Sequence, residues 1–375
     1  MSAIQAFDPV DFTKELVRIP SCDPPGGELA VAEAVVRQLT ALGIDCILDE
    51  FLPGRANVTG RVRGTGTKRP MVFSAHLDTV PVGDQAWAKS PFSGAVSEGR
   101  LQGRGSSDMK SAVAAFIAAA DVLNQRQTPL AGDVILAFTA GESANCLGAR
   151  HLVAQGFQAE IGSFLCGEPS TLDIIVVEKA ILWLRATAKG EMGHVSGAAG
   201  VNAINLIMDF LTRLRGVSLD LPGHPLLTPP SVNVGRIAGG TAVNLTPDLC
   251  TAEIDVRFGP GIAVETVMAQ LQAVLPYRVS LEVTDFKVAV EEPADSAFII
   301  TCANAILRKT GRQPQIKGVS YYSDGAILLD GLNVPFAIVG PGDLGMSGQA
   351  NETASIGRIR DVVDIYVDIA TAWLA

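Results

Sequence analysis

Apolar residues in the first half of the chain alternate between helical and extended spacing. Residues 28–42 place apolar side chains on one helical face and the run stops at Gly43, which predicts a helix. Apolar runs bounded by turn-forming residues predict strands. On these two patterns we expect helices at residues 7–18, 28–42 and 109–123, and strands at residues 44–51, 58–62, 71–73 and 134–139. This alternation predicts an α/β fold with a mostly parallel sheet.

The strand at residues 71–73 leads into the sequence Ser-Ala-His-Leu-Asp-Thr-Val-Pro at residues 74–81. Because residues i and i+2 of a strand point to the same face, His76 and Asp78 project together from the strand end. This pairing suits an imidazole that binds a metal ion while a carboxylate holds its other ring nitrogen. A buried histidine with a hydrogen-bonded aspartate gives the same pattern, so this spacing leaves both interpretations open.

Three further carboxylates follow apolar runs in the same layer. Asp108 stands in a glycine-rich segment between a strand and a helix, Glu142 follows the run at residues 134–139, and Glu168 stands in Gly-Glu-Pro-Ser. Asp108 by itself also suits a helix cap. A solvated surface explains one such residue, but it explains poorly four that all follow apolar strands. A set of histidine and carboxylate ligands indicates a divalent ion such as zinc, manganese or cobalt.

Length and composition narrow the class of protein. The 375 residues exceed one ordinary core and predict two domains, and 48% hydrophobic with 18% charged residues predicts a globular chain. The formal charge of −10 argues against nucleic acid or an anionic membrane as a partner. The most apolar helical stretch, residues 112–120, is too short to span a bilayer, and the amino-terminal residues lack a signal-peptide pattern. Six cysteines without a C-x-x-C motif suit a reducing compartment, so we expect a soluble cytoplasmic protein.

An ordered series of motifs along nearly the whole chain resembles that of a known enzyme family. The motifs are SAHLDTVP at 74–81, GRGSSDMK at 103–110, TAGE at 139–142, EPS at 168–170, GEMGH at 190–194, GVNAI at 200–204, GGTAVN at 239–244, DVR at 255–257, YSDG at 322–325 and GPGDLG at 340–345. The series is similar to that of the co-catalytic zinc metallopeptidases, which include acetylornithine deacetylase, succinyl-diaminopimelate desuccinylase, aminoacylase and glutamate carboxypeptidase.

The resemblance implies a division of the chain into two domains. A catalytic α/β/α domain is expected from residues 1–178 and 289–375. An inserted α+β lid is expected from residues 179–288. In this family the lid usually forms the interface of a homodimer, so a second copy of the chain is the expected protein partner.

The resemblance also assigns roles to residues. His76, Asp108 and Glu168 are implied as metal ligands, Asp78 as the residue that orients His76, and Glu142 as the general base for the attacking water. His194, acting from the lid of the partner subunit, is implied to stabilise the oxyanion, while Asn244 and Arg257 are implied to hold a carboxylate of a small-molecule substrate. From the residues alone, a salt bridge to Asp255 accounts for Arg257 and a loop position accounts for His194.

The chain departs from the family pattern at the second metal. The family has Glu-Glu where this chain has Glu142-Ser143, and it has a metal-binding histidine where this chain has Gly348. No histidine follows His224, so a shifted alignment does not restore that ligand. We therefore expect one zinc, cobalt or manganese ion per subunit. Cys146, Cys166 and Asp343 stay open as replacement ligands.

The leading hypothesis is a metal-dependent amidohydrolase that removes an acyl group from a small amino acid or cleaves a peptide-like amide. A second hypothesis keeps the fold but uses Glu142 for proton transfer without hydrolysis, as an isomerase, epimerase, lyase or acyl transferase. A third is a non-catalytic binding protein. The retained Glu142 and His194 argue against this last hypothesis, because a protein that only binds needs neither residue.

Overall fold

The computed structural model describes residues 7–143, 145–197 and 200–375. The chain forms two compact units. One contains the residues up to 176 together with 291–317 and 323–375, and the other contains residues 177–290 together with 318–322. We call them the catalytic unit and the lid unit.

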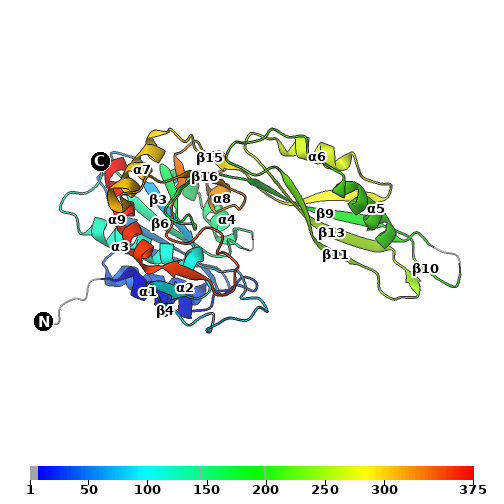
Figure 1. The fold of residues 1–375 in the computed structure, drawn as a ribbon, viewed down its shortest axis with the longest axis horizontal. Helices are drawn as coiled ribbons and strands as arrows, with labels where there is room; N and C mark the ends of the chain where they lie inside the picture. Colours follow the sequence, from blue (N-terminus) through cyan, green and yellow to red (C-terminus); the bar gives the residue numbers. More distant parts are fainter. Residues whose placement is uncertain (1–6, 144, 198–199) are drawn as a thin grey trace. The chain divides into compact units, whose positions relative to one another are not determined.

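The catalytic unit is built on a nine-stranded sheet whose central strands are parallel (Figure 1). β3 (Met71–His76) lies between β6 (Val134–Thr139) and β7 (Ser163–Cys166), and it is parallel to both. The sheet continues through β17 (Phe336–Ile338) and β8 (Ile174–Glu178), with β15 (Val290–Glu291) and β16 (Ile316–Val319) beyond, and it ends on the other side with β2 (Arg55–Val62) and β1 (Asp45–Leu52). Every residue of β3 and β6 is buried, as expected for parallel strands covered on both faces.

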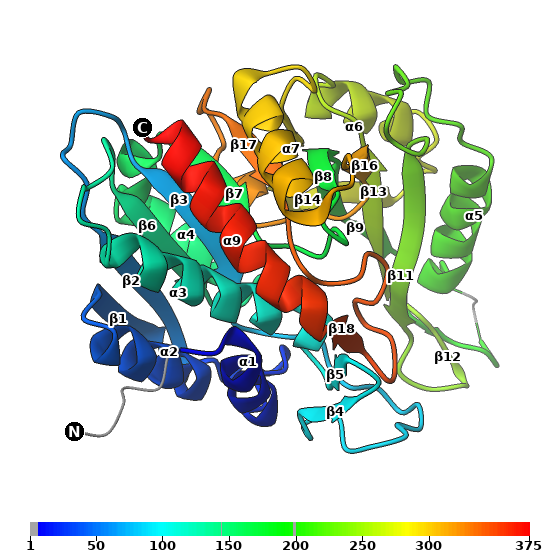
Figure 2. The ribbon, with the colours of Figure 1, turned by 60° about the vertical axis from the view of Figure 1, so that its left-hand side comes forward.

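Helices cover this sheet. The helices of the catalytic unit are α1 (Pro9–Arg18), α2 (Leu29–Ala41), α3 (Ser111–Asn124), α4 (Leu147–Ala154), α7 (Ala297–Thr310), α8 (Gly325–Leu328) and α9 (Ile356–Trp373), with short turns η1 (Ser106–Lys110) and η2 (Phe157–Glu160). Figure 2 shows α3 and α9 side by side in front of the sheet and α4 behind it. Almost every residue of α3 is buried, because its alanines let α9 and the sheet approach closely on opposite sides.

A small sheet and the lid unit complete the fold. The small sheet pairs β5 (Arg100–Gln102) with β4 (Ala95–Ser97) and β18 (Thr353–Ser355). The lid unit has a four-stranded antiparallel sheet in the order β11 (Ser231–Gly239), β13 (Leu249–Phe258), β9 (Ala180–Lys189) and β14 (Val279–Lys287). It also has helices α5 (Ala203–Arg215) and α6 (Val264–Gln272) and a two-stranded ribbon of β10 (Gly193–His194) and β12 (Leu245–Thr246).

The expected α/β class with a mostly parallel sheet is confirmed. Several element boundaries differ from those expected, among them that of β3, which continues to His76, and two of the differences have clear physical reasons. β2 begins at Arg55 rather than at residue 58, because Arg55 and Asn57 are buried polar residues that a hydrophobic pattern does not detect. α3 begins at Ser111 rather than at residue 109, because Asp108 and Met109 have non-helical backbone angles. None of the helices in the described ranges is long and apolar enough to cross a membrane.

Three aromatic rings join the central sheet to its covering helices. Phe116 of α3 stacks on Phe73 of β3 at 4.7 Å and on Tyr366 of α9 at 4.3 Å between ring centroids. The Tyr366 hydroxyl donates a hydrogen bond to the carbonyl of Val339. The rings of Phe73 and Phe116 are fully buried, so this stack fixes α3, and with it the loop that precedes α3, against the sheet.

Phe116→Ala is expected to lower the free energy of unfolding by about 3–5 kcal/mol, because it leaves a cavity between α3, β3 and α9. Val122→Ala on the same helix is the matched control, since Val122 is 48% exposed, and its effect is expected to stay within about 0.5 kcal/mol. Urea unfolding followed by circular dichroism measures both. A loss below about 1 kcal/mol for Phe116→Ala would contradict the role of the stack.

Candidate metal and catalytic site

His76 lies at the centre of a group of acidic side chains at the carboxyl edge of the parallel sheet. It is the last residue of β3 and is 4% exposed. Its Nδ1 lies 3.0 Å from the backbone carbonyl of Asp78, and its Nε2 lies 3.1 Å from Oδ1 of Asp108 and 3.6 Å from Oε1 of Glu168. A proton on Nδ1 donated to that carbonyl leaves the Nε2 lone pair directed at the two carboxylates.

The three side chains offer a donor set that suits zinc. One ligand atom from each of His76, Asp108 and Glu168 lies within 4.8 Å of the others. Burial disfavours a charged imidazole, but Asp78, Asp108 and Glu168 outweigh it and raise the pKa of His76 well above its usual value. The site therefore favours positive charge between these groups. An imidazole nitrogen with two carboxylate oxygens is a common zinc ligand set that leaves a coordination position open.

The acidity of the two carboxylates is set by opposing effects. Burial raises the pKa of Glu168 well above its usual value, and the neighbouring Asp108 adds to this. Burial also acts on Asp108, but hydrogen bonds from His76 and Ser347 outweigh it and lower the pKa of Asp108. Asp108 is thus the more readily ionised of the two carboxyl groups.

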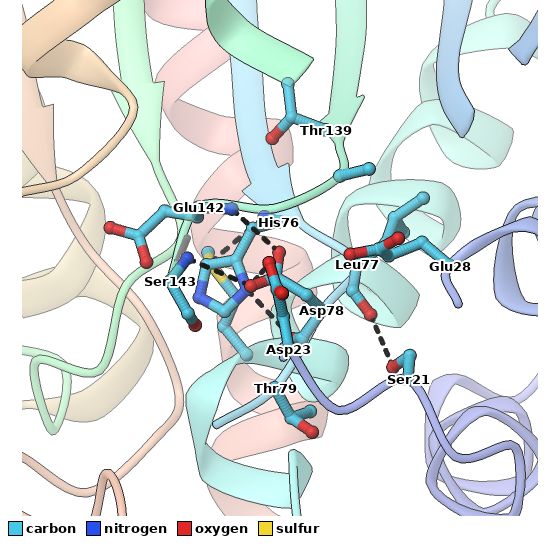
Figure 3. A network of polar contacts seen from close by, with 12 residues as sticks. Ser21, Asp23, Glu28, His76, Leu77, Asp78, Thr79, Thr139, Glu142 and Ser143 are labelled. Atoms are coloured by element: carbon cyan, nitrogen blue, oxygen red, sulfur yellow. Dashed lines mark hydrogen bonds and ion pairs between the residues drawn. The ribbon is translucent and has the colours of Figure 1, made fainter. Parts of the chain in front are cut away.

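Asp78 holds the loop that carries Glu142. Its two carboxylate oxygens accept hydrogen bonds from the backbone N–H groups of Glu142 and Ser143, each 3.0 Å long (Figure 3). The carboxylate oxygen nearest to His76 Nδ1 is 3.6 Å away, longer than a hydrogen bond. The sequence led us to expect this carboxylate on the imidazole. The structure instead gives that contact to the backbone carbonyl of Asp78.

Glu142 stands three residues beyond β6, after a turn that requires glycine. Gly141 has a φ of 69°, and a Cβ at this position would lie 2.3 Å from Nη2 of Arg55. Burial raises the pKa of the half-buried Glu142 well above its usual value, and the nearby Asp324 and Asp78 add to the shift. A carboxyl group with a raised pKa is suited to accept and return a proton near neutral pH.

Asp78 also belongs to a second acidic cluster, which was not predicted from the sequence. Asp23, Glu28 and Asp78 are all buried, with carboxylate oxygens within 4.8 Å of one another. Arg55 supplies positive charge through contacts of 2.7 Å to Asp23 and 2.6 Å to Glu28. Backbone hydrogen bonds join Ser21 and Asp23 to Thr79, which brings Asp23 beside Asp78 (Figure 3).

Asp324 is another buried acid beside the site. It is 3% exposed and accepts a hydrogen bond from the hydroxyl of Thr139, at the end of β6. Burial raises the pKa of Asp324 to about 6. The residue lies within the motif at 322–325, but no role was predicted for it. In the sequence, Asp324 is only a polar residue before a short apolar helix, and this pattern does not indicate a functional role.

The predicted lid residues form two groups in the lid unit. Nε2 of His194 lies 3.2 Å from Nδ2 of Asn244, and Nδ1 of His194 lies 2.6 Å from the Ser196 hydroxyl. Pairing of β10 with β12 brings His194 and Asn244 together across 50 residues of sequence. Arg257 donates from Nε and Nη2 to Asp255 and from Nη1 to the carbonyl of Ser320.

Gly348, where the resemblance led us to expect a lost ligand, and the candidate replacement ligands have other contacts. Gly348 has a φ of 73°, and its carbonyl accepts a hydrogen bond from Arg104. Asp343 forms ion pairs with Arg100 and Arg358. Within the described part of the chain, neither Asp343 nor the thiols of Cys146 and Cys166 join the group formed by His76, Asp108 and Glu168.

Comparison with known proteins identifies the family. Residues 72–372 match the family model described as peptidase family M20/M25/M40. The chain belongs to this family. The M20 family consists of zinc-dependent hydrolases of amide and peptide bonds that act on small acylated amino acids and peptides, and this protein is accordingly a metallohydrolase.

Relatives within the M20 family are distant in sequence and close in fold. Succinyl-diaminopimelate desuccinylase of Rhodospirillum centenum is 30% identical over 389 residues, which cover 99% of this chain and 98% of that protein. The desuccinylase of Cereibacter sphaeroides is 34% identical over 265 residues, covering 67% and 68%. Among solved structures, the metallo-carboxypeptidase Sso-CP2 of Sulfolobus solfataricus has a TM-score of 0.77 at 17% identity, covering 97% of this chain and 98% of that one.

Replacing Asp324 with asparagine is expected to change how stability depends on pH. The folded-state pKa of about 6 exceeds the usual 3.8, so this carboxyl group stabilises the fold fully below pH 4 and loses that contribution as the pH rises through 6. The free energy of unfolding of the wild type should therefore fall relative to Asp324→Asn by roughly 3 kcal/mol between pH 4 and 7.

Urea unfolding of both proteins across this pH range, with a chelator present, measures the difference. Thr139→Val serves as a second variant. It removes a hydrogen bond that favours the charged form, so it should move the transition to higher pH. Parallel stability curves for wild type and Asp324→Asn would show that Asp324 does not titrate in this range.

Proposed function

We propose that the protein hydrolyses the amide bond of a small N-acylated amino acid, using one divalent metal ion per subunit. The observation that carries the proposal is the complete group of His76, Asp108 and Glu168 beside the half-buried Glu142. Zinc is the proposed ion, and cobalt or manganese suit the same ligands.

The metal ion and the side chains have separate roles in the proposed reaction. When bound, the metal ion polarises the scissile carbonyl and lowers the pKa of water. Glu142 takes the proton from the attacking water and returns it to the departing amine nitrogen as the C–N bond breaks. Asp78 supports this role because its carboxylate fixes the backbone of Glu142 and Ser143.

A single ion is proposed because this chain lacks two side chains that would hold another. The YXEP protein of Bacillus subtilis, with a TM-score of 0.75 at 17% identity, is described as a dinuclear metal-binding peptidase. In this chain Ser143 and Gly348 stand at the positions where ligands of a second ion are expected. Interactions with His76, and to a lesser extent with Ser347, lower the pKa of Asp108 and favour its charged form.

The proposed substrate carries a free carboxylate. Relatives named succinyl-diaminopimelate desuccinylase support an N-succinyl amino acid as the first compound to test. Arg257 is the proposed carboxylate-binding residue, together with Asn244. Three of the five N–H donors of a guanidinium are used in the contacts of Arg257 with Asp255 and Ser320, so two remain for a ligand.

We further propose that the lid unit forms a homodimer and supplies His194 to the partner's active site as an oxyanion-stabilising residue. Among the strands of the described residues, β11 pairs only with β13, so its other edge can pair with a second copy. Val234 and Ile237 of this strand are 39% and 51% exposed. His194 and Asn244 are also exposed, as a residue that acts across subunits requires.

Metal analysis and a substrate panel test the hydrolase proposal. Protein equilibrated with zinc and then desalted should hold close to one ion per subunit, and His76→Ala should hold close to none. Glu142→Gln should keep its zinc but lose about 10²–10⁴ in kcat on N-acyl amino acids, since it removes only the proton acceptor.

Each alternative has its own outcome in these assays. Two tightly held ions would contradict the single-ion proposal. Solvent deuterium uptake into a substrate without cleavage would indicate proton-transfer chemistry in place of hydrolysis. Binding of N-acyl amino acids with no turnover by the zinc-loaded protein would indicate a binding protein.

Mixing two inactive variants tests whether His194 acts across subunits. A heterodimer of Glu142→Gln and His194→Ala should contain one complete site, formed by Glu142 of one subunit and His194 of the other. Random exchange of equal amounts should restore about a quarter of wild-type activity. If the mixture stays inactive although mass spectrometry shows heterodimers, His194 does not act on the partner.

A further inference from the structure

Glu352 is a buried carboxylate that accepts four hydrogen bonds from the loop leading to Asp108. Oε1 accepts from the backbone N–H groups of Ser107 at 2.8 Å and of Asp108 itself at 3.0 Å. Oε2 accepts from the N–H of Gly105 at 3.1 Å and from Nη1 of Arg104 at 2.6 Å. Its side chain is only 1% exposed, and its two oxygens thus bind the backbone on both sides of Ser106.

Long-range strand pairing brings Glu352 to this loop. Glu352 directly precedes β18, which pairs with β5 in the register Thr353 to Gln102. The N–H of Gly103 donates to the backbone carbonyl of Glu352 at 2.9 Å, which continues this pairing by one residue. The loop that leads to Asp108 begins where β5 ends. The pairing of β18 with β5 therefore places the Glu352 carboxylate beside the start of this loop.

Arg104 is the counter-ion of Glu352 and is itself fully enclosed. Its guanidinium is 1% exposed and lies over the ring of Trp87, 5.2 Å from the centroid. It also donates to the carbonyls of Pro81, Gly348 and Gln349 at 3.2–3.3 Å. It therefore connects the segment after His76 with residues 348–352.

We propose that Glu352 is the positioning residue for the metal ligand Asp108, and that Arg104 holds the Glu352 side chain in place. The inference rests on the proposed metal site. Asp108 and Met109 have non-helical backbone angles, so helix geometry does not set the direction of the Asp108 side chain. The hydrogen bonds to Glu352 fix the backbone at Ser107 and Asp108 instead. Partners that orient metal ligands typically change metal affinity by 10–100-fold when they are mutated.

Glu352→Gln tests the proposal with little change in volume. A carboxylate presents acceptors at both oxygens, whereas an amide presents donors on one side, so two of the four hydrogen bonds become donor–donor contacts. The zinc dissociation constant, measured by competition with a chromophoric chelator, is expected to rise by about 10–100-fold. Cobalt-loaded protein should show shifted visible absorption bands, because the geometry at Asp108 changes.

Asp173→Asn is the matched control for a loss of stability alone. Asp173 is 5% exposed and accepts hydrogen bonds from Arg312 and from the backbone of Gln315, with Lys317 also within 2.8 Å. It therefore resembles Glu352 as a buried carboxylate with a cationic and a backbone partner. Its substitution should lower the melting temperature and leave zinc affinity and the cobalt spectrum unchanged.

Milder variants keep the test informative if Glu352→Gln does not fold. Glu352→Asp and Arg104→Lys preserve charge and should give zinc dissociation constants between those of wild type and Glu352→Gln. Wild-type zinc affinity in the folded Glu352 and Arg104 variants, with zinc binding lost in His76→Ala, would overturn the role of Glu352 and leave the metal site intact. Tight zinc binding by His76→Ala would instead overturn the metal site, and with it this inference.

Discussion

The burial of two carboxylates against one imidazole ring is the constraint on which the rest of this site depends. Asp108 and Glu168 face Nε2 of His76, and their charge is costly in a buried place unless a cation compensates it. The pKa of His76 is raised for the same reason, because the site favours a positive charge beside these carboxylates. Either a proton or a divalent ion can supply that charge. The surrounding structure keeps these groups together despite their repulsion.

Two further buried carboxylates hold the loops around this site by accepting hydrogen bonds from backbone N–H groups. Asp78 accepts the amides of Glu142 and Ser143, and Glu352 accepts those at Ser107 and Asp108. In each case a buried acid fixes a loop that carries a side chain of the proposed site. Glu352 pairs with Arg104, whereas Asp78 lies beside Asp23 and Glu28, which pair with Arg55.

The sequence predicted the parallel sheet but not the buried polar residues that form hydrogen bonds around it. The strand expected at residues 134–139 is confirmed as β6, because a fully buried parallel strand appears as an unbroken apolar run. The same pattern missed the start of β2, where Arg55 and Asn57 are buried for their hydrogen bonds. It also placed the start of α3 two residues early, at a loop whose backbone is held by Glu352.

The amino-acid sequence by itself determined the fold class and the identity of the residues around His76. Both depend largely on local order, since apolar periodicity defines the strands, and His76, Glu142 and Glu168 stand at or after the ends of β3, β6 and β7. Asp108 was expected in the same layer, but it follows β5 of the small sheet. Only the tertiary structure decided which acids act on which loops. Glu352 reaches Asp108 across 244 residues, and Asp78 reaches Ser143 across 65. Such contacts arise from strand pairing and buried charge compensation, and these join distant segments through interactions that no local pattern encodes.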